Sequence, residues 1–178
     1  MIFSSVFLLS LHSGCVRTRA YQYSDAPVGQ ALLNPLPNFR DADFLAKWSQ
    51  PVSEPDKIRY LLERVASSTN PFLRNGGTYN GKVARQWLLF KTNHWVSGVE
   101  TADDFIVRVA SFSQKTGKPY LVEIPPGKIY SLRSVLQNEL AAFENFQAQI
   151  KALPSNDAAP KPSQGIVAQA PLTKTQVV

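Results

Sequence analysis

The chain has 178 residues, 44% of them hydrophobic, and a formal net charge of +6 at pH 7. This length accommodates one domain of ordinary size, and the hydrophobic content suffices for its core. The basic residues are spread thinly along the sequence rather than clustered among aromatic residues, so we expect no nucleic-acid partner.

Cysteine and histidine are both scarce. Cys15 is the single cysteine, and the two histidines are His12 and His94. No intrachain disulfide forms from one cysteine, and zinc sites made of four cysteines, or of two cysteines and two histidines, are excluded. We therefore expect neither a metal nor a cofactor.

The first residues have the features of an export signal. Residues 2–11 form an apolar run that is too short to cross a bilayer, which needs about 20 residues, but that fits a secretory signal. The following Cys15 resembles the cysteine of a bacterial lipobox, although His12 replaces the usual aliphatic residue. We expect residues 1–14 to be a signal peptide and Cys15 to be lipidated. Cleavage of an ordinary signal after Ala20 is the alternative.

Lipidation would decide where the protein works. Two or three acyl chains, at about 0.8 kcal/mol per buried CH2, hold a protein permanently at a membrane, whereas one chain holds it marginally. Val16 follows the cysteine in place of an acidic residue, which by resemblance to known sorting rules favours the outer membrane. The expected location is the periplasmic face of that membrane, or the periplasm if Cys15 is not lipidated.

Residues 15–52 are expected to form an extended tether, because four prolines interrupt them and deny a long helix its backbone donors. A short helical piece is expected at 41–48. The segment has more leucines and aromatic residues than a spacer needs, so it either packs along its own domain or is kept for a partner. Trp48 is the candidate anchor for such an interaction.

Residues 53–151 are predicted to form a mainly helical α+β domain of about four helices with a short sheet of two or three strands. Ser53 has the features of an N-cap, and Thr101 and Asp104 have the spacing of a capping box. The turn sequence Asn75-Gly76-Gly77 follows the first strand. The expected helices are 53–66, 80–96, 101–109 and 131–150, and the expected strands are 72–74, 120–124 and 128–130.

Two further predictions concern the second helix and the C-terminus. Val83, Trp87 and Phe90 fall along one stripe of helix 80–96, which Ala84, Leu88 and Leu89 widen. Trp87 and Trp95 are expected to belong to the core. Residues 152–178 are mostly Ala, Pro, Ser, Gln, Lys and Thr, with too little apolar content to offset an ordering cost of roughly 1–2 kcal/mol per residue. We expect this tail to be disordered in isolation.

Several short runs resemble a small family of exported bacterial proteins that is catalogued only as a domain of unknown function. They are Phe72-Leu73-Arg74-Asn75-Gly76, Tyr79, Thr101-Ala102-Asp103-Asp104-Phe105-Ile106, Ala110-Ser111 and Gly117-Lys118-Pro119-Tyr120-Leu121-Val122. The resemblance covers about residues 54–145 and implies location and fold rather than chemistry. The usual member is a signal peptide plus the domain. The added tether and tail suit a subunit of a larger envelope assembly, such as the outer-membrane part of a secretion machine.

The candidate contacts for a ligand or partner are Arg74, Tyr79, Lys118 and Tyr120, in addition to Trp48. Arg74 lies beside a glycine-rich turn, where turn N–H groups would help it to bind a carboxylate or phosphate. The alternative is that Arg74 pairs with Asp103 or Glu123 and fixes the sheet against a helix.

Catalytic arrangements find little support in the sequence. Asp103 and Asp104 are neighbours in the first turn of a helix, where they point apart and complement the helix dipole. His94 with Ser111 or Ser113 would be the basis of a hydrolase, but no Gly-x-Ser-x-Gly motif accompanies them. We therefore expect a non-enzymatic protein.

The function expected from the sequence is that of an exported lipoprotein that serves as a structural or accessory subunit of a cell-envelope assembly. Its partners would be other envelope proteins, and its N-terminal lipid would hold it to the membrane. The alternative is a periplasmic binding module for a small anion or a cell-wall fragment, centred on Arg74, Tyr79, Lys118 and Tyr120.

Overall fold

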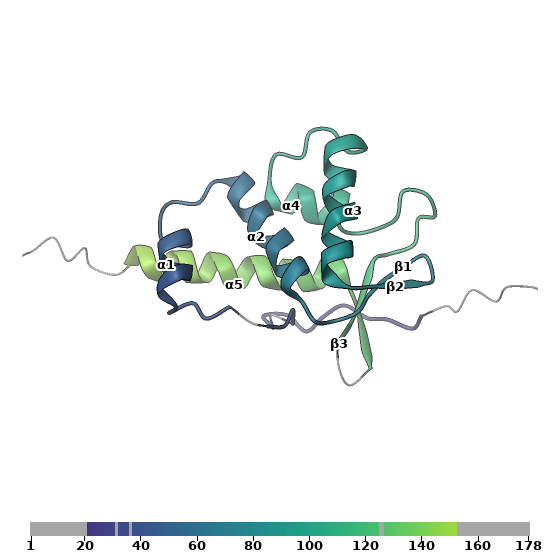
Figure 1. Cartoon of the computed structure of the whole chain (residues 1–178), viewed down its shortest axis with the longest axis horizontal. Coiled ribbons are helices and arrows are strands. Elements are labelled where there is room, and N and C mark those ends of the chain that lie inside the picture. Colours follow the sequence, from purple (N-terminus) through teal and green to yellow (C-terminus); the bar gives the residue numbers. More distant parts are fainter. Residues whose placement is uncertain (1–20, 31, 36, 125–126, 153–178) are drawn as a thin grey trace, which may run out of the picture.

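The computed structural model describes residues 21–30, 32–35, 37–124 and 127–152, and the expectations for the signal peptide, Cys15 and residues 153–178 lie outside them. The elements are α1 (Ala42–Trp48), α2 (Glu54–Ser67), β1 (Phe72–Arg74), β2 (Gly77–Tyr79), α3 (Gly81–His94), α4 (Ala102–Asp104), the π-helical η1 (Phe105–Val109), β3 (Leu121–Ile124), β4 (Lys128–Ser131) and α5 (Leu132–Ala152). This arrangement confirms the predicted α+β class. Figure 1 shows α5 running along the domain, with α1 beside its C-terminal end and the sheet near its N-terminal end.

The sheet has four strands in the order β2-β1-β3-β4, and every pair of neighbours is antiparallel. The sequence predicted two or three strands, because Gly77 was assigned to a turn, whereas it begins β2. The turn consists of Asn75 and Gly76, with φ angles of 51° and 86°. Positive φ at both central residues is typical of the type I′ turns that suit the twist of a tight hairpin.

Two capping boxes define helix starts, one at Thr101, as predicted, and one at Ser53, where the sequence predicted an N-cap. The Ser53 side chain accepts a hydrogen bond from the backbone N–H of Asp56, whose carboxylate accepts from the N–H of Ser53. Thr101 and Asp104 repeat the arrangement at the start of α4. Hydrogen bonds from the hydroxyl and backbone of Thr101 lower the pKa of Asp104. Asp104 is thus engaged in stabilising a helix end.

The helix expected at 101–109 is interrupted. After one α-helical turn it widens into η1, where the N–H of Ala110 donates to the carbonyl of Phe105, five residues earlier, at 3.0 Å. The widened segment ends the helix and leaves the carbonyl of Val109 available to a side chain from another element, Lys91 of α3.

The N-terminal end of α3 packs against the C-terminal end of α2, and the contact leaves room only for glycine. A Cβ atom at Gly81 would lie 2.1 Å from the carbonyl oxygen of Val65 and 2.9 Å from that of Ser68. No other residue fits at the first position of α3 without moving the C-terminal end of α2. This contact fixes which face of α3 is buried, namely the one with Ala84 and Leu88.

One hydrophobic core lies between α5, α2, the sheet and η1. Its largest fully buried apolar side chains come from these elements, from α3 and from two residues outside helices and strands: Leu33, Leu61, Phe72, Leu88, Phe105, Ile106, Tyr120, Leu132, Leu136 and Phe143.

The described part of the predicted tether lies against the domain. Ser24 pairs with Tyr130 as a one-residue parallel bridge beside β4. Further along, the N–H of Ala26 donates to Ser134 Oγ at 2.8 Å, and Asn138 Nδ2 donates to the carbonyl of Pro27 at 2.7 Å. Polar side chains of α5 therefore hold the backbone of this segment, which runs beside the helix in Figure 1.

The aromatic residues of the segment pack on the same domain. Trp48 is 3% exposed, and its ring meets those of Tyr60 and Phe143 edge-on, with centroids 5.7 and 5.4 Å apart. Phe39 stacks on Phe146 at 5.0 Å. Of the two alternatives for this segment, the structure shows packing along its own domain. Trp48 is a core residue rather than an exposed anchor, because α1 turns its ring inward.

A buried ion pair joins the segment to two helices. Arg64 Nε of α2 donates to Glu139 Oε2 of α5 at 2.8 Å, and the two side chains are 6% and 1% exposed. The other carboxylate oxygen of Glu139 accepts from the N–H of Leu33 at 2.9 Å. The terminal nitrogens of Arg64 donate to the carbonyls of Leu33 and Pro35. The pair is therefore completed by backbone groups of residues 33–35.

Replacing Arg64 by alanine is expected to lower the free energy of unfolding by about 3–5 kcal/mol, because Glu139 would remain buried without its partner. Lys47→Ala is the control, since Lys47 and Glu63 form an exposed pair at 2.7 Å, which is worth less than about 1 kcal/mol. Urea denaturation of both variants measures the difference. Equal, small losses would show that the buried pair does not hold the fold together.

Candidate functional site

Arg74 is the last residue of β1 and lies between aromatic rings. Its guanidinium carbon is 4.7 Å from the centre of the Trp87 ring and 5.6 Å from that of Tyr120. Among the described residues it forms no ion pair. The pairing with Asp103 or Glu123 considered from the sequence is therefore absent from the described part of the chain, and the aromatic rings provide the main surroundings of this cation.

Two hydrogen-bond donors in this cluster are buried without a partner in the described structure. They are Nε of Arg74 and Nε1 of Trp87. Buried polar groups in folded proteins are almost always hydrogen bonded, so each such donor requires an explanation. Burial raises the pKa of Tyr120, and the charge of Arg74 and a side-chain hydrogen bond with it counteract the rise. Nε of Arg74 nevertheless stays without a partner in the described structure.

Lys91 places a second cation near the same tyrosine. Its side chain is 1% exposed, and Nζ donates to the carbonyl oxygens of Val109 and Phe112 at 2.7 and 2.8 Å. Nζ lies 5.4 Å from the centre of the Tyr120 ring. Burial, assisted by the positive charge of Arg74, lowers the pKa of Lys91 to about 8.

Tyr79 of β2 adds a third ring to this surface. Its ring centroid lies 6.2 Å from that of Trp87, and its hydroxyl would be 2.8 Å from a Cβ atom at Gly77. The absence of a side chain at Gly77 therefore lets the Tyr79 ring fold over the hairpin. The structure thus brings Arg74, Tyr79 and Tyr120 together around Trp87.

The fourth predicted contact, Lys118, lies on a neighbouring loop and is exposed. That loop is tied to the hairpin turn, because Thr116 Oγ1 donates to Asn75 Oδ1 at 2.6 Å and Asn75 Nδ2 donates to Ser113 Oγ at 3.2 Å. The carbonyl of Lys118 accepts from the N–H of Ser113 at 2.9 Å, which fixes its backbone within this loop.

Apolar side chains are exposed along α3 and at its two ends. Val83 and Phe90, in the stripe identified from the sequence, are 36% and 48% exposed, and Trp95, expected in the core, is 53% exposed. The buried face consists of Ala84 and Leu88, which the sequence placed at the edge of the stripe, together with Gly81 and Lys91. Ala84 and Leu88 each lie one position after a residue of the stripe. Because successive residues lie 100° apart around a helix, the buried face is rotated away from Val83 and Phe90. We define the α3 surface as Tyr79, Val83, Phe90 and Trp95.

Sequence reasoning overlooked Lys91 and its relation to Arg74. Its position was a signal, because it lies three residues after Leu88 and seven after Ala84, on the apolar face of the helix. A lysine on the apolar face of a helix has a buried ammonium group, which needs hydrogen-bond acceptors. Here the carbonyl oxygens of Val109 and Phe112 provide them.

Positive charge is concentrated in the part of the chain that contains the cluster. Residues 71–119 contain seven lysines and arginines but three aspartates and glutamates. The ion pairs of the described residues all join residues of α1, α2 and α5. The basic residues around α3 are thus left without acidic partners within the described structure.

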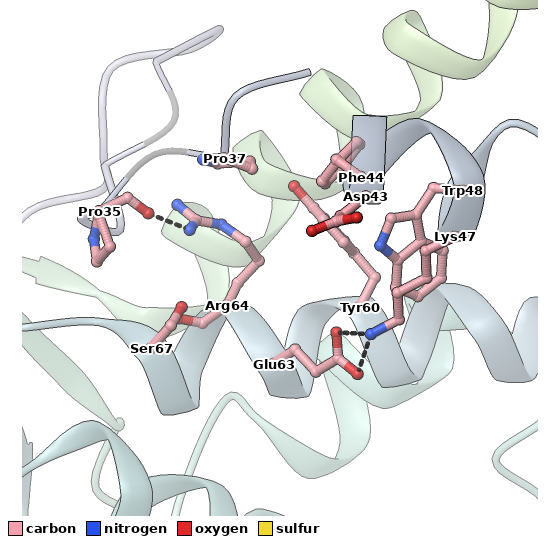
Figure 2. Close-up of a pocket in the computed structure, with 10 residues that line it drawn as sticks. All are labelled: Pro35, Pro37, Asp43, Phe44, Lys47, Trp48, Tyr60, Glu63, Arg64 and Ser67. Carbon is pink, nitrogen blue, oxygen red and sulfur yellow. Dashed lines mark hydrogen bonds and ion pairs between the residues drawn. The ribbon is translucent and has the colours of Figure 1, made fainter. Parts of the chain in front are cut away.

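A crevice of about 380 Å³ lies between residues 35–48 and α2 (Figure 2). Phe44, Trp48 and Tyr60 contribute its apolar lining, and the Lys47–Glu63 ion pair borders it. The hydroxyl of Tyr60 is buried without a partner in the described structure, and burial raises its pKa. Asp43 and Arg64 also line the crevice. Arg64 is engaged with Glu139, and Lys47 with Glu63, so three of its four charged side chains are already paired.

The residues considered for hydrolysis do not form a triad. Ser111 Oγ donates to the carbonyl of Ile106 at 2.8 Å, and Ser113 Oγ accepts from Asn75. His94 is exposed, with its ring 4.6 Å from that of Phe90. Within the described ranges, no three His, Cys, Asp or Glu residues are placed to hold a metal ion.

Among the residues whose positions are described, no helix combines the length and the apolar character that a bilayer-crossing helix needs.

Comparisons with known proteins agree with the resemblance seen in the sequence. A family model described as "Family of unknown function (DUF5329)" matches residues 52–144. The "Uncharacterized protein YfeK" of Salmonella typhimurium is 38% identical over 68 residues, which are 38% of this chain and 57% of that protein. The chain thus aligns with little more than half the length of this relative. No solved structure matches.

The buried ammonium group gives a pH-dependent prediction. The pKa of Lys91 is lowered to about 8 in the folded protein, from 10.5. Between these values the unfolded chain binds the additional proton, so Lys91 makes the free energy of unfolding rise with pH. The penalty for burying its charge is fully present below pH 8. Urea titrations at pH 7 and 9.5 should therefore show wild type gaining stability relative to Lys91→Met, and a constant difference would contradict the lowered pKa.

Proposed function

We propose that this chain, which belongs to the family of unknown function DUF5329, is a non-enzymatic exported lipoprotein that acts as an accessory subunit of a cell-envelope assembly. It would do so by docking a partner protein on the α3 surface. The observation that carries the proposal is the concentration of exposed apolar side chains there. Four of the eight large apolar residues exposed in the described structure, Tyr79, Val83, Phe90 and Trp95, belong to this surface.

The composition of the α3 surface supports a protein partner. Aromatic residues supply much of the binding energy at protein interfaces, where they enter pockets of the partner. Phe90 contacts the ring of Trp95 edge-on at 5.2 Å, so these two rings form one raised apolar feature. Scattered single apolar residues would need no explanation, but a contiguous aromatic feature indicates an interaction site.

The surrounding charge specifies the partner's chemistry. Lys82 and Arg85 lie on α3 next to Val83 and form no ion pair within the described residues. Complementary charge across an interface speeds encounter and excludes wrong partners. The partner is therefore an envelope protein with acidic side chains around an apolar pocket. The outer-membrane part of a secretion system is one assembly that such a subunit would suit.

The proposed location derives from the sequence. The apolar run at residues 2–11 and the single cysteine, Cys15, support export and lipidation. A lipid anchor would restrict the search for a partner to one membrane surface.

Site-specific photocrosslinking tests the docking surface. With benzoylphenylalanine at position 90, cells should give one discrete crosslinked product with an acidic envelope protein. The control is position 28, because Val28 is 97% exposed but lies outside α3. The double variant Lys82→Glu, Arg85→Glu should reduce the product at least tenfold. A product of two copies of this chain, equal products at both positions, or no product at position 90 would contradict the proposal.

Lipidation has its own test. Labelled palmitate should enter the wild-type protein but not Cys15→Ser, and the variant should move from the membrane fraction to the periplasmic fraction. Ala20→Arg is the control, because it blocks cleavage after residue 20 without removing the cysteine. A mature protein that begins at Tyr21 and carries no acyl group would show that an ordinary signal peptide is removed instead.

A periplasmic module for a small anion is the second candidate. It is favoured by the position of Arg74 and Lys91 near one tyrosine without an acidic partner in the described structure. In the first candidate the negative charge belongs to acidic side chains of a partner protein. In the second it belongs to a small anion that is free in the periplasm.

A further inference from the structure

The guanidinium of Arg74 has more hydrogen-bonding capacity than the described structure uses. The group offers five N–H donors in one plane, and Nε is buried without an acceptor. Trp87 and Tyr120 lie against it at cation–π distances. Stacking against aromatic rings leaves the in-plane donors of a guanidinium free, so these contacts do not satisfy them.

A second donor and a second charge lie close to the first. Nε1 of Trp87 is buried and without an acceptor in the described structure. The ammonium group of Lys91 lies 5.4 Å from the centre of the Tyr120 ring, which Arg74 also contacts. Leaving positive charge uncompensated in a partly buried position destabilises a protein. An anion would compensate the charge and accept hydrogen bonds from both orphaned donors.

The shape of the cluster favours a carboxylate among anions. Arg74 presents a planar fork, which a carboxylate matches with two parallel hydrogen bonds. The flanking rings of Trp87, Tyr120 and Tyr79 suit a flat group with an apolar stem, since each presents an apolar face. Lys91 already uses two of its three donors on the carbonyls of Val109 and Phe112, which leaves little capacity for the additional oxygens of a phosphate.

The cluster is continuous with the α3 surface. The ring of Tyr79, which belongs to that surface, lies 6.2 Å from the ring of Trp87, which belongs to the cluster. A partner seated on Phe90 and Val83 would therefore reach Arg74 over Tyr79 and Trp87. This continuity indicates a protein rather than a free solute as the source of the anion.

We propose that Arg74 and the indole N–H of Trp87 form a receptor for one carboxylate group of the docked partner protein. This inference rests on the proposed docking function and specifies the partner's anchoring group as an acidic side chain or a chain end. The carboxylate lies against Trp87 and Tyr120, and its charge offsets those of Arg74 and Lys91.

Nuclear magnetic resonance of the whole mature chain tests the receptor with N-acetylglycine as a minimal carboxylate. The indole N–H signal of Trp87, assigned with Trp87→Phe, and the Nε–H signal of Arg74 should shift saturably. N-acetylglycinamide, which lacks the charge, should shift neither, and Arg74→Gln should weaken the response at least tenfold. No saturable shift, or an equal response to inorganic phosphate, would overturn the carboxylate receptor.

The crosslinking assay separates this inference from the docking proposal. If the product at position 90 persists undiminished in Arg74→Gln and the titration is silent, docking stands and the receptor fails. If N-acetylglycine binds but no product forms at position 90, the cluster serves a free anion and the partner-supplied carboxylate is refuted. A product weakened at least fivefold by Arg74→Gln, together with a positive titration, supports both.

Thermal unfolding of the unliganded protein distinguishes a receptor from a structural arginine. Arg74→Met retains the bulk of the side chain but removes the charge, so the midpoint should stay constant or rise. Arg108→Met is the matched control, because Arg108 donates to the carbonyls of Ser97 and Gly98, and its loss should lower the midpoint. A fall for Arg74→Met as large as that of the control would show that Arg74 stabilises the fold and would contradict the receptor.

Discussion

The ion pair between Arg64 and Glu139 is the interaction on which the arrangement of the domain depends. Both charges are nearly inaccessible to water, a condition that destabilises a protein unless the remaining donors and acceptors are satisfied. Backbone groups of Leu33 and Pro35 complete the pair. The segment before the domain is thus a structural requirement of the pair, although the family match begins only at residue 52. In this chain the domain proper and the described residues that precede it form one folded unit.

Arg64 and Arg74 show how differently one residue type is used in a small protein. Arg64 directs its donors to a carboxylate and to carbonyl groups, so its charge is neutralised inside the fold. Arg74 contacts aromatic rings and has no acidic partner among the described residues. The first arrangement stabilises the protein by itself. The second leaves one donor of the guanidinium without an acceptor in the described structure, and such a buried donor requires an explanation.

The features that the sequence predicted are mainly those set by neighbouring residues. Ser53 and Thr101 define helix starts through residues three positions later, and Asn75 with Gly76 defines a hairpin turn through its own backbone preferences. The position of the described residues between 21 and 52 is set by contacts with α2 and α5, several of them more than 30 residues away in the sequence. Local sequence pattern therefore did not decide between packing on the domain and binding a partner. The exposed face of α3 was misjudged for a related reason. Its rotation is fixed by the contact of Gly81 with α2, which apolar spacing alone does not reveal.

The bridge between Ser24 and Tyr130 has a consequence for the reach of a lipidated protein. Since the chain is already fixed to the sheet at Ser24, only the eight residues 16–23 separate Cys15 from this attachment point. Even fully extended, at about 3.5 Å per residue, they span at most about 30 Å. Acylation would therefore hold the folded domain close to the lipid headgroups. Any protein that it recruits would have to approach within one domain's breadth of the bilayer.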